Sequence, residues 1–238
     1  MATVATDADF VATLMRGNRT LYSRLHEFNL LPTRSMHPSW RVALFPPSVQ
    51  ALLERSDLDA RTHARLSAYL LEGPTVGART FWEPSPGLAL ALLEPAALME
   101  LARRIGAAFA SGKLRNLLTG GWAATARRSL GEGLHDFALQ RAPLLMEPAD
   151  LDSAAAQGLD PTEEGLSEVV ATLGAGTLRS AWEPEGLWPR ARLKLPRDLA
   201  EAAEQVPAAP PAACKRLALR IARENEPQWH TSFAPASA

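Results

Sequence analysis

The clearest structural signal in the chain is the stretch Pro95-Ala-Ala-Leu-Met-Glu-Leu-Ala-Arg-Arg-Ile-Gly-Ala-Ala-Phe109. Its large apolar side chains recur every three or four residues, and Arg103 and Arg104 fall between them on the other side. Proline is favoured in the first turn of a helix, and glycine is a common residue just past its end. The pattern therefore predicts an amphipathic helix that begins at Pro95 and ends near Gly112.

Similar periodicity extends over much of the rest of the chain. Further helices are expected at 9–28, 48–55, 59–71, 113–118, 122–139, from Asp160 onward and at 198–205. Residues 29–40 contain two prolines and predict an ordered loop or an extended segment, and residues 72–87 predict a loop. Residues 214–221 alternate like a strand but also accommodate a helix, so both alternatives stay open.

Composition favours the same fold class. The 238 residues are 47% hydrophobic and 6% aromatic, and Ala, Leu, Arg and Glu, which favour helices, are abundant. The sequence predicts a mainly α protein, an irregular helical bundle with Pro-, Gly- and Trp-rich loops and little or no sheet. We expect a single domain over 1–238, with a Pro/Ala linker at 206–213 before a C-terminal element and a loose tail at 225–238.

Charge and cysteine content indicate a soluble protein of a reducing compartment. The net charge is −1, which excludes a globally basic nucleic-acid or membrane binder, and Cys214 is the only cysteine. The longest uncharged runs, such as 42–53, contain about a dozen residues, whereas a membrane-spanning helix needs ~20. The start of the chain carries no basic segment typical of a secretory signal, so we expect a cytoplasmic location without membrane insertion.

The sequence predicts no enzymatic activity, cofactor or metal site. The run from Gly106 to Lys113 resembles a phosphate loop, but five residues separate its glycines and Leu114 follows the lysine where Ser or Thr would hold Mg²⁺. None of the five histidines pairs with another at a spacing of three or four residues, and one cysteine excludes a Cys-rich zinc site. No arrangement typical of nucleophilic catalysis is present.

One charge asymmetry predicts a binding face. Residues 96–145 are rich in arginine, and residues 147–170 contain acidic residues without a basic one. We expect Arg103, Arg104, Arg127 and Arg128 to project from their helices and meet an acidic partner surface. Two alternatives stay open: the arginines form an ordinary solvated face, or they pack against the acidic segment.

Two segments resemble the SctK family of type III secretion systems. Phe28-Asn-Leu-Leu-Pro-Thr-Arg-Ser-Met-His-Pro-Ser-Trp40 is similar to the N-terminal Phe-Asn…Pro…His-Pro element of that family. Cys214-Lys-Arg-Leu-Ala-Leu-Arg220, followed by a Pro-Gln-Trp ending at Trp229, is similar to its C-terminal element. The matching residues, for which we expect structural roles, are Asn29, Pro32, His37, Pro38, Trp40, Cys214, Lys215, Arg216, Leu217 and Arg220.

The resemblance implies a non-enzymatic cytoplasmic adaptor of the injectisome sorting platform. Members of the family link the cytoplasmic domain of the inner-membrane ring protein to the pod protein that carries the ATPase complex. The expected location is peripheral, at the cytoplasmic face of the ring, with no nucleic-acid partner. Two alternatives are a helical nucleic-acid-binding protein that uses the arginines of 96–141 and an unrecognised helical hydrolase.

Overall fold

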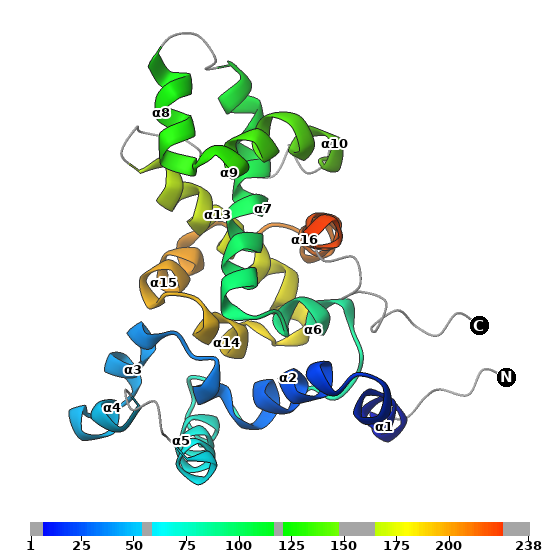
Figure 1. Cartoon of the computed structure of the whole chain (residues 1–238), viewed down its shortest axis with the longest axis vertical. Coiled ribbons are helices and arrows are strands. Elements are labelled where there is room, and N and C mark those ends of the chain that lie inside the picture. The colour runs from blue at the N-terminus through cyan, green and yellow to red at the C-terminus, as the bar shows by residue number, and fades with distance from the viewer. Residues whose placement is uncertain (1–6, 54–58, 117–120, 148–164, 226–238) are drawn as a thin grey trace, which may run out of the picture. The chain divides into compact units, whose positions relative to one another are not determined.

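The computed structural model describes residues 7–53, 59–116, 121–147 and 165–225, and within these ranges it is helical with no strand (Figure 1). The predicted mainly α class is therefore confirmed. The chain divides into two compact units. The described residues of unit 1 lie within Met1–Pro95 and Pro189–Arg197, and those of unit 2 lie within Ala96–Trp188 and Asp198–Pro227.

Unit 1 is built mostly of short helices. In chain order they are α1 (Asp7–Gly17), α2 (Arg19–Leu30), the 3₁₀ turn η1 (Pro32–Arg34), α3 (Pro38–Leu44), α4 (Pro47–Leu53), α5 (Ala60–Glu72) and α6 (Pro86–Ala91). A late segment completes the unit: α14 (Trp188–Ala191) enters it and η4 (Arg192–Lys194) follows. The core of unit 1 thus combines side chains from early and late parts of the sequence, such as Phe28, Trp40 and Leu193, all of which are buried.

Two expectations for unit 1 are corrected. The helix expected at 9–28 is divided, because the Asn18 side chain accepts a hydrogen bond from the backbone N–H of Leu21 at 3.0 Å and caps a new helix. The segment 29–40 is not an extended loop. Pro32 and Pro38 each occupy the first position of a helical turn. The helix needs no backbone N–H donor at that position, so a proline fits there.

Unit 2 contains the longest helices of the described ranges together with several short ones. In chain order its elements are α7 (Pro95–Asn116), α8 (Gly121–Leu130), α9 (Glu132–Asp136), the π-helical segment η2 (Phe137–Arg141), α10 (Ala142–Leu145), α13 (Leu166–Trp182), the 3₁₀ turn η3 (Glu183–Glu185), α15 (Arg197–Gln205) and α16 (Pro211–Asn225). Helix α13 packs extensively on α16. The helix expected at 198–205 is confirmed by α15, and α16 resolves the open question at 214–221 in favour of a helix.

Glycines let α7 and α13 approach each other closely. A Cβ atom on Gly106 would lie 1.8 Å from the carbonyl oxygen of Val170, and one on Gly174 would lie 1.7 Å from that of Ala102. Real Cβ atoms do not come that near another atom, so only glycine fits at these two positions. Their role in close backbone packing was not predicted.

Two helix boundaries in unit 2 also differ from expectation. Helix α7 does not end at Gly112 but continues to Asn116, because the next turn buries Leu114 in the core. The prediction of a separate helix at 113–118 is therefore wrong. The helix expected at 122–139 is interrupted at Gly131, whose φ of 81° breaks the helical path. Residues 206–210 are non-helical, and the helix start expected at Asp160 and the tail at 226–238 lie outside the described residues.

Candidate partner-binding surfaces

The four arginines expected to bind a partner fall into two pairs. Arg103 and Arg104 on α7 are only partly exposed. A guanidinium NH2 group of Arg103 donates to the carbonyl oxygen of Leu130 at 3.2 Å. Arg104 pairs with Glu100 at 2.8 Å, and its guanidinium carbon lies 5.2 Å from the centre of the Phe137 ring. Both side chains therefore hold α7 to neighbouring parts of unit 2.

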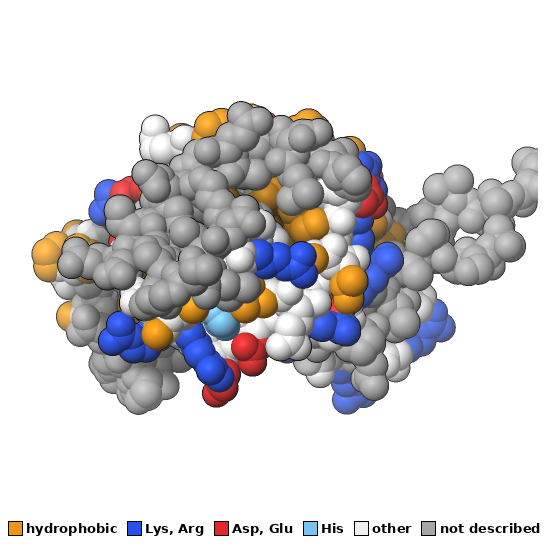
Figure 2. All heavy atoms as spheres, turned by 90° about the horizontal axis from the view of Figure 1, so that it is seen from above, with side chains coloured by type: hydrophobic (Ala, Val, Ile, Leu, Met, Phe, Trp, Pro, Cys, Tyr) orange, Lys and Arg blue, Asp and Glu red, His pale blue; other side chains and the backbone are white. Residues whose placement is uncertain are grey.

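Arg127 and Arg128 on α8 are exposed. Arg127 forms an ion pair with Glu132, and Arg128 donates to the hydroxyl of Thr125 at 3.1 Å. Among the coloured side chains of the face in Figure 2, the basic ones stand at several separate places with hydrophobic ones between them. Of the four predicted residues, these two are the ones most accessible to another protein.

An open hollow of about 290 Å³ lies beside the π-helical segment. Its lining mixes both charges and is formed by Arg104, Gly133, Asp136, Phe137, Gln140, Arg141 and Glu224. Arg141 and Glu224 form an ion pair across sequence-distant elements, and Arg115 donates to the Leu139 carbonyl within the π-helix at 2.9 Å. The two arginines and two carboxylates of the lining balance, so the hollow offers no net charge that would select a small ion.

The N-terminal motif residue Asn29 lies at the centre of a buried hydrogen-bond network in unit 1. Its side-chain nitrogen donates to the carbonyl oxygens of Leu25 and Phe81 at 3.1 and 2.9 Å, and its side-chain oxygen accepts from the N–H of Phe81 at 2.6 Å. Arg190 donates to the Asn29 carbonyl at 3.2 Å and to that of Gly77 at 2.8 Å. Asn29 thereby fixes the end of α2 to two distant segments.

The second part of the motif surrounds the start of α3. His37 caps this helix through Nδ1, its own N–H donates to the Leu193 carbonyl at 2.7 Å, and Pro38 supplies the first turn. Trp40 is buried, and its indole N–H lies 2.9 Å from the Leu195 carbonyl and 3.2 Å from that of Arg192. Pro32 is buried in η1. These contacts join the motif to the late segment 189–197.

The C-terminal motif lies on α16 in unit 2. Cys214 and Leu217 are buried on its inner side, and Arg216 is exposed. Lys215 forms an ion pair with Glu185, and Arg220 forms one with Glu147. Most of the acidic segment 147–170 lies outside the described residues, so the alternative that it packs against the arginines stays open.

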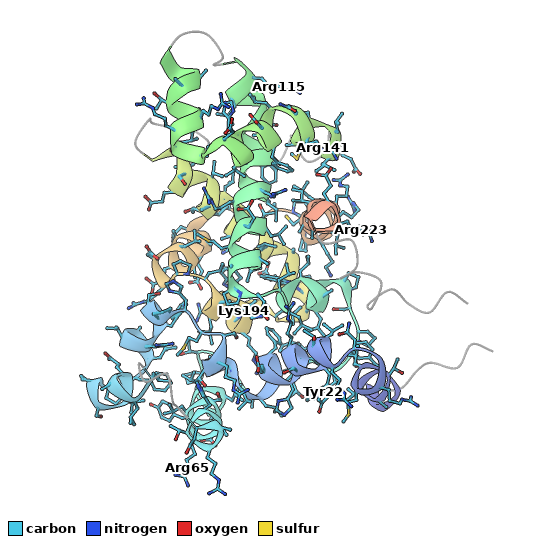
Figure 3. All side chains as sticks on the ribbon, viewed as in Figure 1. Tyr22, Arg65, Arg115, Arg141, Lys194 and Arg223 are labelled. Carbon is cyan, nitrogen blue, oxygen red and sulfur yellow. The ribbon has the colours of Figure 1, made fainter. Side chains whose placement is uncertain are left out.

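Two buried cations in unit 1 were not predicted. Lys194 is buried, and its ammonium group donates to the carbonyl oxygens of Ala91 and Leu93, each at 2.8 Å (Figure 3). Burial lowers the pKa of Lys194 to about 7 and that of Arg190 to about 10. Neither residue stood out in the sequence, since the segment 189–197 holds four cations that alternate with apolar residues, and no local pattern shows which of the four are buried.

A hydroxyl–histidine cluster in unit 1 was also not predicted. The Thr33 hydroxyl lies 3.0 Å from His63 Nδ1 and 2.8 Å from the Ser67 hydroxyl. A hydroxyl within hydrogen-bonding distance of a histidine is a common feature of sites for nucleophilic catalysis. Here Thr33 and Ser67 are almost completely buried, so a substrate could not reach either oxygen. The cluster ties η1 to α5.

Other chemistry is not apparent in the described part of the chain. The run 106–113 that resembles a phosphate loop lies within α7, where its backbone N–H groups are used by the helix. Among the described residues no group of three or more His, Cys, Asp or Glu side chains could hold a metal ion. No helix in these ranges is long and apolar enough to cross a membrane.

One family model matches nearly the whole chain. The family model described as YOP proteins translocation protein K (YscK) matches residues 22–234. The chain belongs to this family. The YscK family is the SctK family of type III secretion systems, so the resemblance seen in the two motifs is confirmed and the protein is a type III secretion component. No curated protein and no solved structure matches the chain.

Proposed function

We propose that this protein is a non-enzymatic adaptor of the type III secretion sorting platform. It links the cytoplasmic domain of the inner-membrane ring protein to the pod protein of the ATPase complex, and it is located at the cytoplasmic face of the ring. The observation that carries this proposal is the family match over residues 22–234, which includes both motifs. The Thr33 and Ser67 hydroxyls beside His63 are buried, which supports a role other than catalysis.

The arginine face is proposed to meet the ring protein. Arg127 and Arg128 are exposed on α8 and can steer an acidic partner over several ångströms. Arg103 and Arg104 support this face from α7 through their contacts with Leu130 and Phe137. The family-motif residues are proposed to act structurally, because Asn29, His37 and Trp40 use their polar groups within unit 1.

Binding of the purified full-length chain to the ring protein's cytoplasmic domain tests this proposal. Reversal of both exposed arginines, Arg127→Glu with Arg128→Glu, should slow association about tenfold and flatten its dependence on salt. The melting temperature should change little, since exposed charges contribute ~0–1 kcal/mol. Arg223→Glu, an exposed arginine on α16, is the matched control and should leave association nearly unchanged (Figure 3).

Two outcomes would contradict the proposal. Wild-type protein that binds neither the ring domain nor the pod protein would exclude the adaptor function. A steeply salt-dependent affinity for DNA or RNA, lost in the double reversal, would favour the nucleic-acid-binding alternative instead.

A further inference from the structure

A charge-free stretch of unit 1 is left at the surface. Residues 42–53 read Val-Ala-Leu-Phe-Pro-Pro-Ser-Val-Gln-Ala-Leu-Leu and contain no charged side chain. Only Phe45 and Leu53 among them are buried. Val42 is 70% exposed and Leu52 is 41% exposed. Exposed apolar side chains that lie together in one region of a protein surface often mark an interaction site.

The stretch continues onto α5 through an aromatic contact. The ring of Phe45, which follows α3, lies 6.1 Å from the ring of Tyr69 on α5, and Tyr69 is 62% exposed. Gln50 of α4 donates to the carbonyl of Phe45 at 2.6 Å and so holds α4 against the end of α3. Val42, Phe45 and Tyr69 therefore belong to one region where α3, α4 and α5 meet (Figure 1).

The edge of this region is basic. Arg61 and Arg65 are exposed and precede Tyr69 by eight and four residues, which places all three along one side of α5. Arg65 points outward from the helix in Figure 3. The acidic groups of this helix are confined to its ends, at the capping residue Asp59 and at Glu72. The side of α5 next to Tyr69 thus favours a binding partner with acidic side chains.

We propose that α3, α4 and α5 form a docking surface for a partner protein that presents the apolar face of an amphipathic helix edged by Asp and Glu. Val42 and Tyr69 are the apolar anchors, and Arg61 and Arg65 pair with the acidic edge. Exposed tyrosine and arginine are the residue types that most often dominate binding energy. The inference rests on the proposed adaptor function. Because that proposal has the ring protein meet the arginine face of unit 2, the surface on unit 1 is assigned to the second partner, the pod protein.

The test measures the affinity of full-length variants for the purified pod protein and, separately, for the ring protein's cytoplasmic domain. Val42→Asp and Tyr69→Ala should each raise the Kd for the pod protein about tenfold or more. Arg65→Glu should raise it less and weaken its salt dependence. Leu144→Asp, at an exposed leucine of α10 in unit 2, is the matched control and should leave both Kd values unchanged. The Val42, Arg65 and Leu144 variants should keep the wild-type melting temperature, because their side chains are exposed. Tyr69→Ala should lower it slightly, because it also removes the ring contact with Phe45.

Each alternative outcome overturns the inference. If wild-type protein binds both partners and the Val42 and Tyr69 variants bind them equally well, the docking surface is refuted and the adaptor function stands. If wild-type protein binds neither partner, both proposals fail. If the variants bind the pod protein normally but lose binding to phosphatidylglycerol vesicles, or change from dimer to monomer in sedimentation, a membrane or a second copy is the occupant instead.

Discussion

The two units of this protein are stabilised in different ways. Unit 1 is joined by polar side chains that bind backbone groups far away in sequence, as Arg190 and Lys194 do with Asn29, Gly77, Ala91 and Leu93. Unit 2 is built around long helices, of which α7 and α13 meet through Gly106 and Gly174. In unit 1, directional hydrogen bonds determine how distant segments pack together. In unit 2, the close fit of two helix backbones determines how α7 and α13 pack.

This difference determines which changes each unit tolerates. A buried donor or acceptor that loses its partner costs ~1–3 kcal/mol, so unit 1 is sensitive to deletion of single polar or amphipathic side chains. A close helix crossing has no room for an added atom, so unit 2 is sensitive to insertion of a single methyl group. The following experiments test the comparison, from the largest expected effect to the smallest.

Trp40→Ala should destabilise unit 1 by ~3–5 kcal/mol, because it empties a buried site and leaves the carbonyls of Arg192 and Leu195 without their indole donor. Denaturation followed by circular dichroism measures this loss. Trp40→Phe, which keeps a ring but not the N–H group, should lose less. A Trp40→Ala protein with unchanged melting and lost partner binding would show instead that this residue belongs to an interface.

Gly174→Ala should destabilise unit 2 by about 3 kcal/mol, because the new methyl group would collide with the Ala102 carbonyl oxygen. Chemical denaturation gives the free energy of unfolding. Gly112→Ala in α7 is the control, since no atom lies within 4 Å of its Cβ position; it should stabilise the protein by ~0.5–1 kcal/mol. Equal effects of the two substitutions would refute close packing at the crossing.

Lys194 should make the stability of unit 1 depend on pH. Its pKa falls from the ordinary 10.5 to about 7 in the folded protein because the group is buried. Between these values the unfolded chain binds a proton that the folded chain does not, so the free energy of unfolding should rise as the pH increases through this range. Below about pH 7 both states are protonated and this contribution to the slope disappears.

Denaturation of Lys194→Met at several pH values isolates this effect. The rise in stability above pH 7 should be absent in that variant and retained in Lys215→Met, which changes the partner of Glu185 on the surface of unit 2. A wild-type protein whose stability stays constant from pH 7 to 10, with the same behaviour in Lys194→Met, would contradict the burial of a lysine that loses its proton.

Arg127→Ala should have the smallest effect on stability, ~0–1 kcal/mol, because its ion pair with Glu132 is exposed to solvent. The free energy of unfolding of the variant, measured at low and at high salt, should differ from that of the wild type mainly at low salt. A loss above about 2 kcal/mol would mean that surface charge, as well as helix packing, stabilises unit 2.

Several features were predictable because they depend on neighbouring residues. The apolar period of α7, the helix expected at 59–71, which α5 confirms, and the helix at 198–205 are local patterns, and all three appear in the structure. The family motifs were also recognisable, since a resemblance requires only the residues themselves. Helix ends were less predictable: Gly112 has the chemistry of a terminus, yet Leu114 packs in the core and the helix continues.

Other features depend on contacts between distant parts of the chain. No local pattern indicates that residues 189–197 complete unit 1, that Lys194 is buried there, or that Arg103 and Arg104 bind neighbouring elements while Arg127 and Arg128 remain exposed. The charge-free run 42–53 was visible in the sequence, but its exposure was not.

The sequence by itself determined that the chain is helical, that it carries the two family motifs, and that its acidic and basic residues nearly balance. These properties follow from residue propensity and order, which neighbouring residues fix. The tertiary structure alone decided which polar groups are buried, which glycines lie at a helix crossing and which apolar side chains stay exposed. Those properties depend on which segments meet in space, and desolvation and steric exclusion act only once the segments have met.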